Sequence, residues 1–173
     1  SDQFLQITRA EQTAEQNFYE FDLLNTIESS IDSLAQQAKA KSITLIFSDE
    51  EPIWLLGNAE LIERAITNLL SNAIKYSPED TSVTIATTSA EHETIIAISD
   101  QGYGITADEL PYIFKRFHRQ RQTEISGEKG AGLGLNFVQV VVSKHKGKIE
   151  VDSEPDTGTT FTLSFPLSES NPS

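Results

Sequence analysis

Apolar residues recur at every third or fourth position in three long segments of the chain, which is the spacing of amphipathic helices. The pattern predicts helices over 22–41, 59–75 and 133–145, each with one face for burial. Asp22 and Asn58 stand at the starts of the first two segments, where a side-chain oxygen commonly caps a helix. Together these segments predict a layer of helices.

Residues 1–15 show a weaker helical pattern with few apolar positions. A segment of this length and polarity does not form a stable helix by itself. We interpret it as the last turns of a helix that begins upstream of Ser1, followed by a linker.

Six shorter segments either alternate in polarity or are rich in β-branched residues, which predicts strands. They are 17–21, 43–47, 82–88, 94–99, 148–152 and 160–165. Residues 106–109 have the composition of a capping box, which predicts a short helix towards Phe114. The polar segment 118–130 predicts a mobile loop, and the polar segment 168–173 predicts a disordered tail. The order of elements predicts a two-layer α/β sandwich, with a helix layer on one mixed sheet.

The composition limits the classes of partner. A chain of 173 residues is long enough for one well-cored domain with a short appendage. The net charge of −13 argues against nucleic acid and against direct contact with an anionic membrane, since both require clustered Lys and Arg. The absence of cysteine fits a reducing compartment, so we expect a cytoplasmic domain. An acidic domain that binds a phosphate compound must concentrate positive charge locally or use a divalent cation.

A first candidate motif lies in the predicted helix 59–75 and just after it. Asn68 and Asn72 are four residues apart and share one helix face, and Lys75 and Tyr76 extend that face. An amide oxygen is a hard ligand that suits Mg²⁺, and a nearby ammonium group suits a phosphate. The alternative is that the asparagines satisfy local backbone groups, which is common for an isolated pair.

A second motif follows the predicted strand 94–99. Asp100 stands at the end of this strand and precedes Gly102 and Gly104. A carboxylate in this position can accept a hydrogen bond from an exocyclic amino group such as that of adenine. The alternative is an Asx turn that ends the strand.

Two further motifs lie in the region of the predicted loop. The first consists of three glycines that lead into a helix: Gly130, Gly132 and Gly134. Backbone N–H groups and the helix dipole are therefore available to bind phosphates. The alternative is a flexible hinge, which explains three glycines equally well. The second motif combines an aromatic anchor, Phe117, with a cation that can bind phosphate, Arg119. The alternative for Phe117 is that it packs on the core.

The four motifs, in this order, resemble the N, G1, F and G2 boxes of the catalytic ATP-binding domain of sensor histidine kinases, within the GHKL superfamily (HATPase_c). The boxes correspond to residues 68–77, 100–104, 113–119 and 130–135, and residues 158–161 resemble the closing strand motif. The resemblance covers about 18–167 and implies a Bergerat-type sandwich with a mobile ATP lid. It assigns 1–15 to the end of a dimerisation-hairpin helix and linker, 16–167 to the catalytic ATP-binding domain and 168–173 to the tail.

The resemblance also implies ATP and Mg²⁺ as cofactors and a role for each site residue. Asn72 and Asn68 would bind Mg²⁺, and Lys75 and Arg119 would contact the phosphates. The implied catalytic residues are Asn68, Lys75 and Arg119. Asp100 would recognise adenine. The other implied cofactor-binding residues are Tyr76, Gly102, Gly104, Ile105, Phe117, Gly130, Gly132, Leu133, Gly134, Leu135 and Thr160.

One position distinguishes this chain from other ATPases with the same implied fold. Gyrase-, mismatch-repair- and chaperone-type relatives carry a water-activating glutamate where this chain has Asn68, which is not a base at neutral pH. The resemblance therefore implies phosphoryl transfer to another nucleophile, a histidine, in two-component signal transduction. A non-transferring ATP-binding or ATPase module that serves partner interaction is the alternative, and a serine-directed kinase also stays open.

The acceptor histidine is expected outside this chain. His92, His118 and His145 do not stand in a segment that resembles a phosphoacceptor helix. The implied partners are the phosphoacceptor hairpin of the same parent kinase, which is implied to be a homodimer, and indirectly a response regulator. The resemblance allows a parent that is anchored in a membrane.

Overall fold

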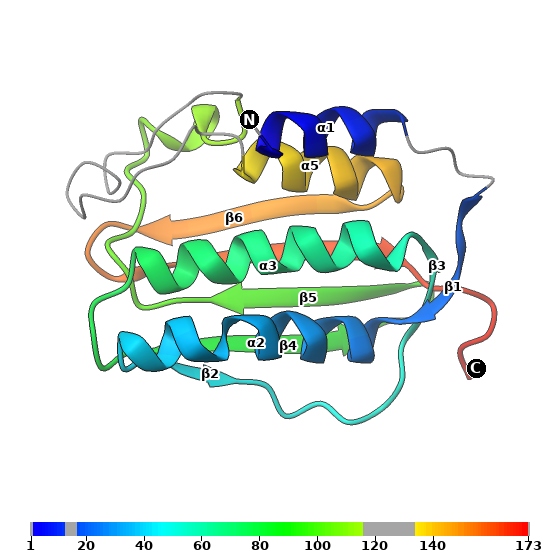
Figure 1. Ribbon diagram of the computed structural model, residues 1–173, viewed down its shortest axis with the longest axis horizontal. Coiled ribbons are helices and arrows are strands. Elements are labelled where there is room, and N and C mark those ends of the chain that lie inside the picture. The colour runs from blue at the N-terminus through cyan, green and yellow to red at the C-terminus, as the bar shows by residue number, and fades with distance from the viewer. Residues whose placement is uncertain (1, 13–16, 116–133, 173) are drawn as a thin grey trace.

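The computed structural model describes residues 2–12, 17–115 and 134–172 (Figure 1). Its helices are α1 (Asp2–Gln12), α2 (Leu23–Ala40), α3 (Ala59–Lys75) and α5 (Gly134–Lys144), with a short 3₁₀ helix at Leu110–Tyr112. Its strands are β1 (Tyr19–Asp22), β2 (Thr44–Ile46), β3 (Trp54–Gly57), β4 (Ser82–Ser89), β5 (Glu93–Ser99), β6 (Lys148–Glu154) and β7 (Gly158–Pro166).

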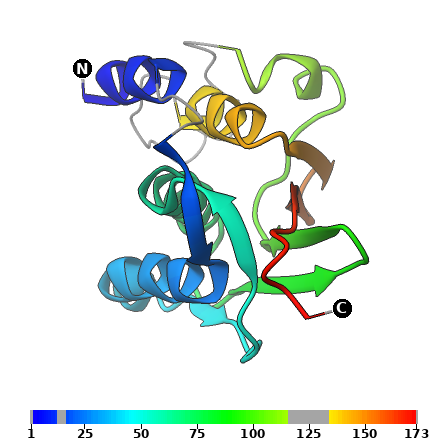
Figure 2. The ribbon, with the colours of Figure 1, turned by 90° about the vertical axis from the view of Figure 1, so that its right-hand side faces the viewer.

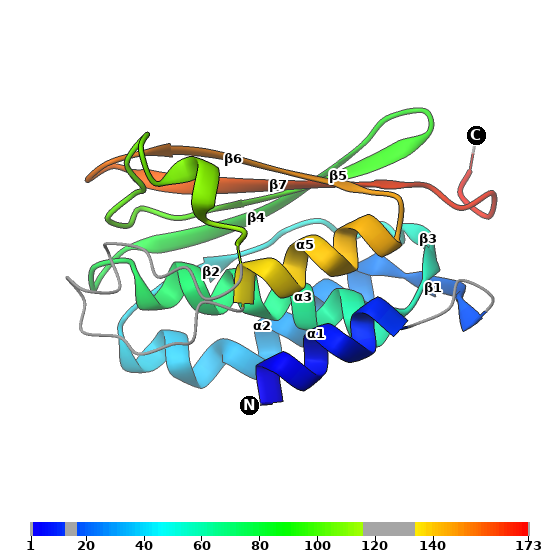
Figure 3. The ribbon, with the colours of Figure 1, turned by 90° about the horizontal axis from the view of Figure 1, so that it is seen from above.

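In the described part of the chain, five strands form one sheet in the order β2-β4-β5-β7-β6. The β2–β4 pair is parallel and the other pairs are antiparallel. The helices cover one face of this sheet, as Figure 3 shows from above. The predicted two-layer α/β sandwich with a mixed sheet is therefore confirmed.

The core lies between the helix layer and this sheet. Helix α3 runs through its centre and buries an unbroken stripe of apolar side chains from Leu61 to Ile74. Strand β7 alternates, so that Phe161, Leu163 and Phe165 face the helices and are almost fully buried. Each such side chain contributes about 1.5 to 3 kcal/mol through burial. The core therefore fixes α3 firmly over the central strands.

The predicted helix caps are present. Asp22 Oδ1 accepts hydrogen bonds from the Leu24 and Ile53 amides, both at 3.0 Å, so the cap of α2 also holds the chain that enters β3. Asn58 Oδ1 accepts from the Leu61 amide at 3.0 Å and caps α3. Both caps are confirmed because each side chain satisfies an amide that the helix leaves without a backbone partner.

A small antiparallel sheet of β1 and β3 lies at the end of the molecule that faces the viewer in Figure 2. The sequence pattern did not predict β3, which is only four residues long and pairs with a strand about 35 positions earlier in the chain. Buried and more exposed residues alternate along β3, but this pattern is recognisable only after Leu55 and Gly57 are known to be buried. Short strands of this kind are determined by tertiary packing more than by propensity.

The predicted capping box at 106–109 was wrong in its side-chain detail. The segment forms a backbone turn, with the Glu109 amide donating to the Thr106 carbonyl at 3.0 Å. The Thr106 hydroxyl is buried and has no hydrogen-bond partner among the described residues, so it does not cap a helix. Pro111 lies within the 3₁₀ helix that follows.

The C-terminal segment, which we expected to be disordered, is held in place as far as Asn171. The Asn171 side chain accepts from the Trp54 amide at 2.9 Å and donates to the Trp54 carbonyl at 2.7 Å. This amide group therefore pairs with β3 as a neighbouring strand would. The hydroxyls of Ser168 and Ser170 donate to the Glu20 carboxylate on β1.

Helix α1 lies alongside α5 (Figures 1 and 3). Ile7 and Ala10 of α1 are fully buried, whereas Leu5 is largely exposed. No helix in the described ranges is both long enough and apolar enough to cross a membrane.

His145, immediately after α5, is buried, which sequence reasoning did not distinguish from a solvated position. Its Nδ1 donates to the Val141 carbonyl at 2.7 Å, and its Nε2 accepts from the Asn58 amide at 3.0 Å. The ring stacks on Phe18, with centroids 4.7 Å apart. Burial lowers the pKa of His145, and only the neutral ring can accept from Asn58.

We expect the stability of the domain to decrease in mild acid because of His145. Since the folded-state pKa lies below the unfolded value of about 6.5, protons favour the unfolded chain. The stability that the neutral His145 ring contributes is fully present above about pH 6.5 and is lost as the pH falls towards the folded-state pKa of His145. Urea unfolding at a series of pH values should show this loss in the wild type and less of it in His145→Gln. The control is His92→Gln, an exposed histidine. Equal pH dependence in all three proteins would contradict the prediction.

Candidate nucleotide-binding site

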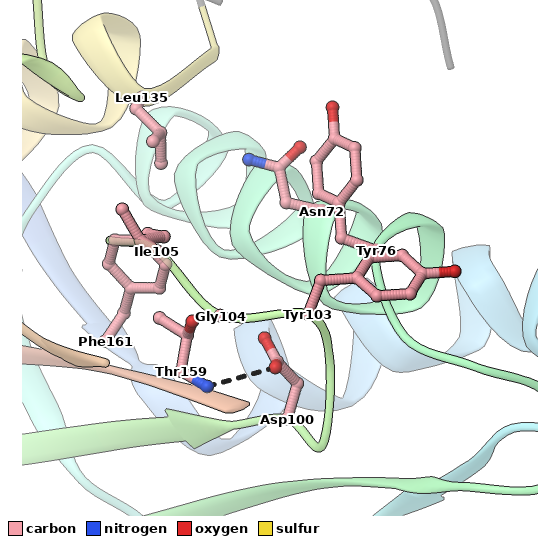
Figure 4. Close-up of a pocket in the computed structure, with 9 residues that line it drawn as sticks. All are labelled: Asn72, Tyr76, Asp100, Tyr103, Gly104, Ile105, Leu135, Thr159 and Phe161. Carbon is pink, nitrogen blue, oxygen red and sulfur yellow. Dashed lines mark hydrogen bonds between the residues drawn. The ribbon is translucent and has the colours of Figure 1, made fainter. Parts of the chain in front are cut away.

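A pocket opens between the C-terminal half of α3 and the adjoining end of the sheet (Figure 4). It is formed by α3, the loop that follows β5, the start of β7 and the first turn of α5. Its lining residues are Asn72, Tyr76, Asp100, Tyr103, Gly104, Ile105, Leu135, Thr159 and Phe161. Segments that are far apart in the sequence therefore meet in one cavity.

Asp100 supplies the carboxylate of the pocket. Its Oδ1 accepts hydrogen bonds from the Gly102 amide at 2.9 Å and from the Thr159 amide at 3.1 Å. Its own amide donates to the Thr159 carbonyl at 2.9 Å. Among the described residues, both donors that bind this carboxylate bind Oδ1. The second oxygen, Oδ2, points away from the strand that carries Thr159 (Figure 4). Asp100 thus forms an Asx turn and also presents one oxygen to the pocket.

Burial raises the pKa of Asp100, and the two backbone hydrogen bonds oppose that rise. A carboxylate in such a partly desolvated place interacts strongly with a donor that can reach it. The pocket therefore contains a well-oriented acceptor for a ligand hydrogen-bond donor.

Two glycines allow the loop after Asp100 to lie against its neighbours. A Cβ at Gly102 would be 2.5 Å from the Tyr76 carbonyl oxygen. Gly104 has a φ of +72°, and a Cβ there would be 2.2 Å from the Glu154 carbonyl oxygen. The loop is also bonded on both sides, because the Tyr103 amide donates to Tyr76 at 3.1 Å and the Tyr103 carbonyl accepts from Asp156 at 2.7 Å. Close packing of backbone on backbone thus fixes the position of Asp100.

The C-terminal end of α3 is fixed as well. Lys41 Nζ donates to the Ile74 carbonyl at 2.9 Å and to the Lys75 carbonyl at 2.7 Å. A cation at this end is favourable because the helix dipole places partial negative charge there. This contact holds the turn of α3 that presents Asn72 and Tyr76 to the pocket.

The structure brings together six of the residues that the sequence predicted for the site. They are Asn72, Tyr76, Asp100, Gly104, Ile105 and Leu135. The half-buried Asn68 and Lys75 lie on the same helix but do not line the pocket in the described residues. Gly134 is the first residue of α5, and a Cβ there would have no neighbour within 4 Å among the described residues. Gly102 supports the loop and is not among the lining residues.

Thr160 faces the other side of the sheet from the pocket. Its hydroxyl bonds to the Ser99 hydroxyl at 2.9 Å on the face away from the helices. The lining residue is its neighbour Thr159, which sequence reasoning missed. Strand alternation provided a signal, since the inward-facing Phe161 and Phe165 place Thr159 on the same face. Tyr103 and Phe161 are further lining residues that were not predicted.

Five predicted site residues lie outside the described residues. They are Phe117, Arg119, Gly130, Gly132 and Leu133, and the centre of the predicted lid falls in the same gap.

Comparison with known proteins identifies relatives of the chain. The sensor-like histidine kinase SenX3 of Mycolicibacterium smegmatis is 43% identical over 112 residues, which cover 65% of this chain and 29% of that protein. The sensor histidine kinase RppB of Synechocystis sp. is 34% identical over 146 residues, which cover 84% of this chain and 32% of that protein. The chain thus spans about a third of the length of these curated relatives.

A solved structure of the mycobacterial sensor histidine kinase MprB matches with a TM-score of 0.73 at 28% identity, covering 87% of this chain and 97% of that chain. A family model described as histidine kinase-, DNA gyrase B- and HSP90-like ATPase matches residues 57–169. That range contains α3, Asp100 and β7, from which the pocket is built. Since the match spans well over half of its length, the chain belongs to the family of histidine kinase-, DNA gyrase B- and HSP90-like ATPases.

Proposed function

We propose that this chain is the catalytic domain of a sensor histidine kinase and that its pocket binds the adenine base of Mg·ATP. The observation that carries the proposal is Asp100, whose Oδ1 is held by two backbone amides while its second oxygen is presented to the pocket. Ile105, Leu135 and Phe161 supply apolar walls that suit a flat base. Sites for cofactors typically combine such walls with a few oriented polar groups.

Residues on α3 beside the pocket would bind the Mg²⁺ and the phosphates. Asn72 lines the pocket and offers a neutral amide oxygen, a ligand that fits Mg²⁺ when phosphates complete the coordination. Asn68 stands one helical turn before it, and both side chains are half-buried on α3. Lys75, Arg119 and the glycines from 130 to 134 would contact the phosphates in this proposal. The donor types present therefore fit a Mg·ATP complex.

The proposed reaction is transfer of the γ-phosphoryl group to a histidine on a separate upstream acceptor domain of the parent protein, in two-component signalling. The protein would contribute mainly positioning and charge neutralisation, which phosphoryl transfer requires. Asn68 in place of a glutamate leaves no general base for water at that position. The relatives that are named sensor histidine kinases support this reading. A response regulator would be the next partner in the pathway.

Asn72→Ala tests the metal part of this proposal. We expect the variant to bind ATP without the increase in affinity that Mg²⁺ gives to the wild type, because the amide ligand is lost. Binding of adenosine, which carries no phosphates, should be unchanged. Calorimetric titrations with and without Mg²⁺ measure both effects. The matched control is Asn25→Ala, an exposed asparagine on α2. Normal Mg²⁺ dependence in Asn72→Ala would assign the metal to other ligands.

A further inference from the structure

The hydroxyl of Ser153, at the end of β6, is the centre of a compact hydrogen-bond network next to the pocket. It accepts from the Ile105 amide at 2.8 Å and donates to the Gly158 carbonyl at 3.1 Å. It also lies 2.7 Å from the hydroxyl of Thr159, with which it shares one hydrogen bond. Ile105 and Thr159 both line the pocket, whereas Ser153 does not.

One arrangement of the hydroxyl protons makes all three bonds at once. The bonds to Gly158 and to Thr159 can be made together only when the single hydroxyl proton of Ser153 lies in the Ser153–Gly158 bond, because the Gly158 carbonyl can only accept. The Ile105 amide can only donate and occupies one lone pair of the Ser153 oxygen. The shared bond is then made by the proton of Thr159, which donates to Ser153. If Ser153 donated to Thr159 instead, the Gly158 carbonyl would lose the Ser153 hydroxyl as a donor.

This assignment determines what Thr159 offers to the pocket. With its proton committed to Ser153, the Thr159 oxygen presents only lone pairs. Thr159 is more than nine-tenths buried, and it lines the same pocket as Asp100, whose Oδ1 accepts from the Thr159 amide at 3.1 Å. The Asp100 oxygen that faces the pocket is also an acceptor. The pocket thus contains one acceptor from Asp100 and one from Thr159.

We propose that Ser153 is a specificity-determining residue that holds the Thr159 hydroxyl as an acceptor, so that the pocket prefers a 6-aminopurine to a 6-oxopurine. The inference rests on the proposed function. An exocyclic amino group has two protons for two acceptors, whereas a carbonyl oxygen would face lone pairs on both sides. A site with unpaired buried polar groups rejects the wrong ligand more strongly than an apolar site does. Ser153 does not line the pocket and acts as a positioning residue through Thr159.

The test compares ATP with ITP, which differs in carrying a 6-oxo group in place of the 6-amino group. Dissociation constants are measured by calorimetry with Mg²⁺ for the wild type, Ser153→Ala and Ser164→Ala. Ser164 is the matched control, because it lies on the outer face of β7. In Ser153→Ala the Thr159 hydroxyl is free to rotate and donate. We therefore expect the preference for ATP over ITP to fall about tenfold in this variant and to be unchanged in Ser164→Ala.

A double-mutant cycle separates this role from a general structural one. Thr159→Val should lower the ATP preference by itself, and adding Ser153→Ala to Thr159→Val should not lower it further. Ser153→Thr, which keeps the hydroxyl, should retain the preference. An unchanged ATP-to-ITP ratio in Ser153→Ala, or an equal effect in the Thr159→Val background, would overturn the inference. Failure of the wild type to bind ATP at all would instead refute the proposed function.

Discussion

Asp100→Asn is expected to weaken ATP binding severely while the fold stays intact. The amides of Gly102 and Thr159 both point at Oδ1, so the asparagine must place its carbonyl oxygen there. Its NH₂ group then occupies the position of the oxygen that faces the pocket, opposite the amino group of adenine. Two donors facing each other in a buried site cost about 1 to 3 kcal/mol or more, which is about fivefold to more than a hundredfold in affinity.

Calorimetric titration with ATP, together with urea unfolding, measures binding and stability separately. The matched control is Asp152→Asn, an exposed aspartate on the outer face of β6. We expect the control to bind ATP as the wild type does and both variants to unfold cooperatively. Wild-type affinity in Asp100→Asn would refute the role of Asp100 in recognising the base.

The chain, incubated alone with labelled Mg·ATP, is expected to remain unlabelled, yet to phosphorylate a separately supplied acceptor hairpin of its parent kinase. The first part follows from the sequence, in which His92, His118 and His145 do not stand in a segment that resembles a phosphoacceptor helix, and the two histidines that the structure describes agree with it. His92 is exposed beside the β4–β5 turn and His145 is buried with both ring nitrogens bonded, and neither lines the pocket. Transfer to the hairpin should be slow, since without a covalent connection the effective concentration of about millimolar is lost.

Labelling with and without the hairpin tests both parts, and Asp100→Asn serves as the control that should transfer little to the hairpin. Stable phosphorylation of a histidine in the chain alone would contradict the expectation that the acceptor is separate. Rapid release of inorganic phosphate without any acceptor would favour an ATPase of the gyrase or chaperone kind.

The sequence was sufficient to predict the parts of the fold that depend on local periodicity. The face of α3 and the caps at Asp22 and Asn58 follow from residue spacing and from side chains that satisfy helix-end amides, and the structure contains them. The same local signals placed Asn72 and Asp100 in separate motifs, which the fold then brings together in one pocket.

Features that depend on distant contacts were not predictable in the same way. Strand β3 exists through its pairing with β1, and the C-terminal segment is held by the Asn171 amide on Trp54, a contact across 117 positions. Sequence reasoning named Thr160, although the alternation along β7 places its neighbour Thr159 on the inward face with Phe161. A shift of one residue in a strand moves a side chain to the opposite face.

The connection between Asp100 and Thr159 also links ligand binding to folding. The two residues are 59 positions apart, and their hydrogen bonds join the end of β5 to the start of β7. A chain that has not yet paired these strands has no such pocket, so a ligand of this site binds only the fully folded domain. By mass action, such a ligand at a hundred times its Kd adds about 2.7 kcal/mol to the free energy of unfolding. Occupancy of the site therefore stabilises the sheet as a whole and not only the residues in contact.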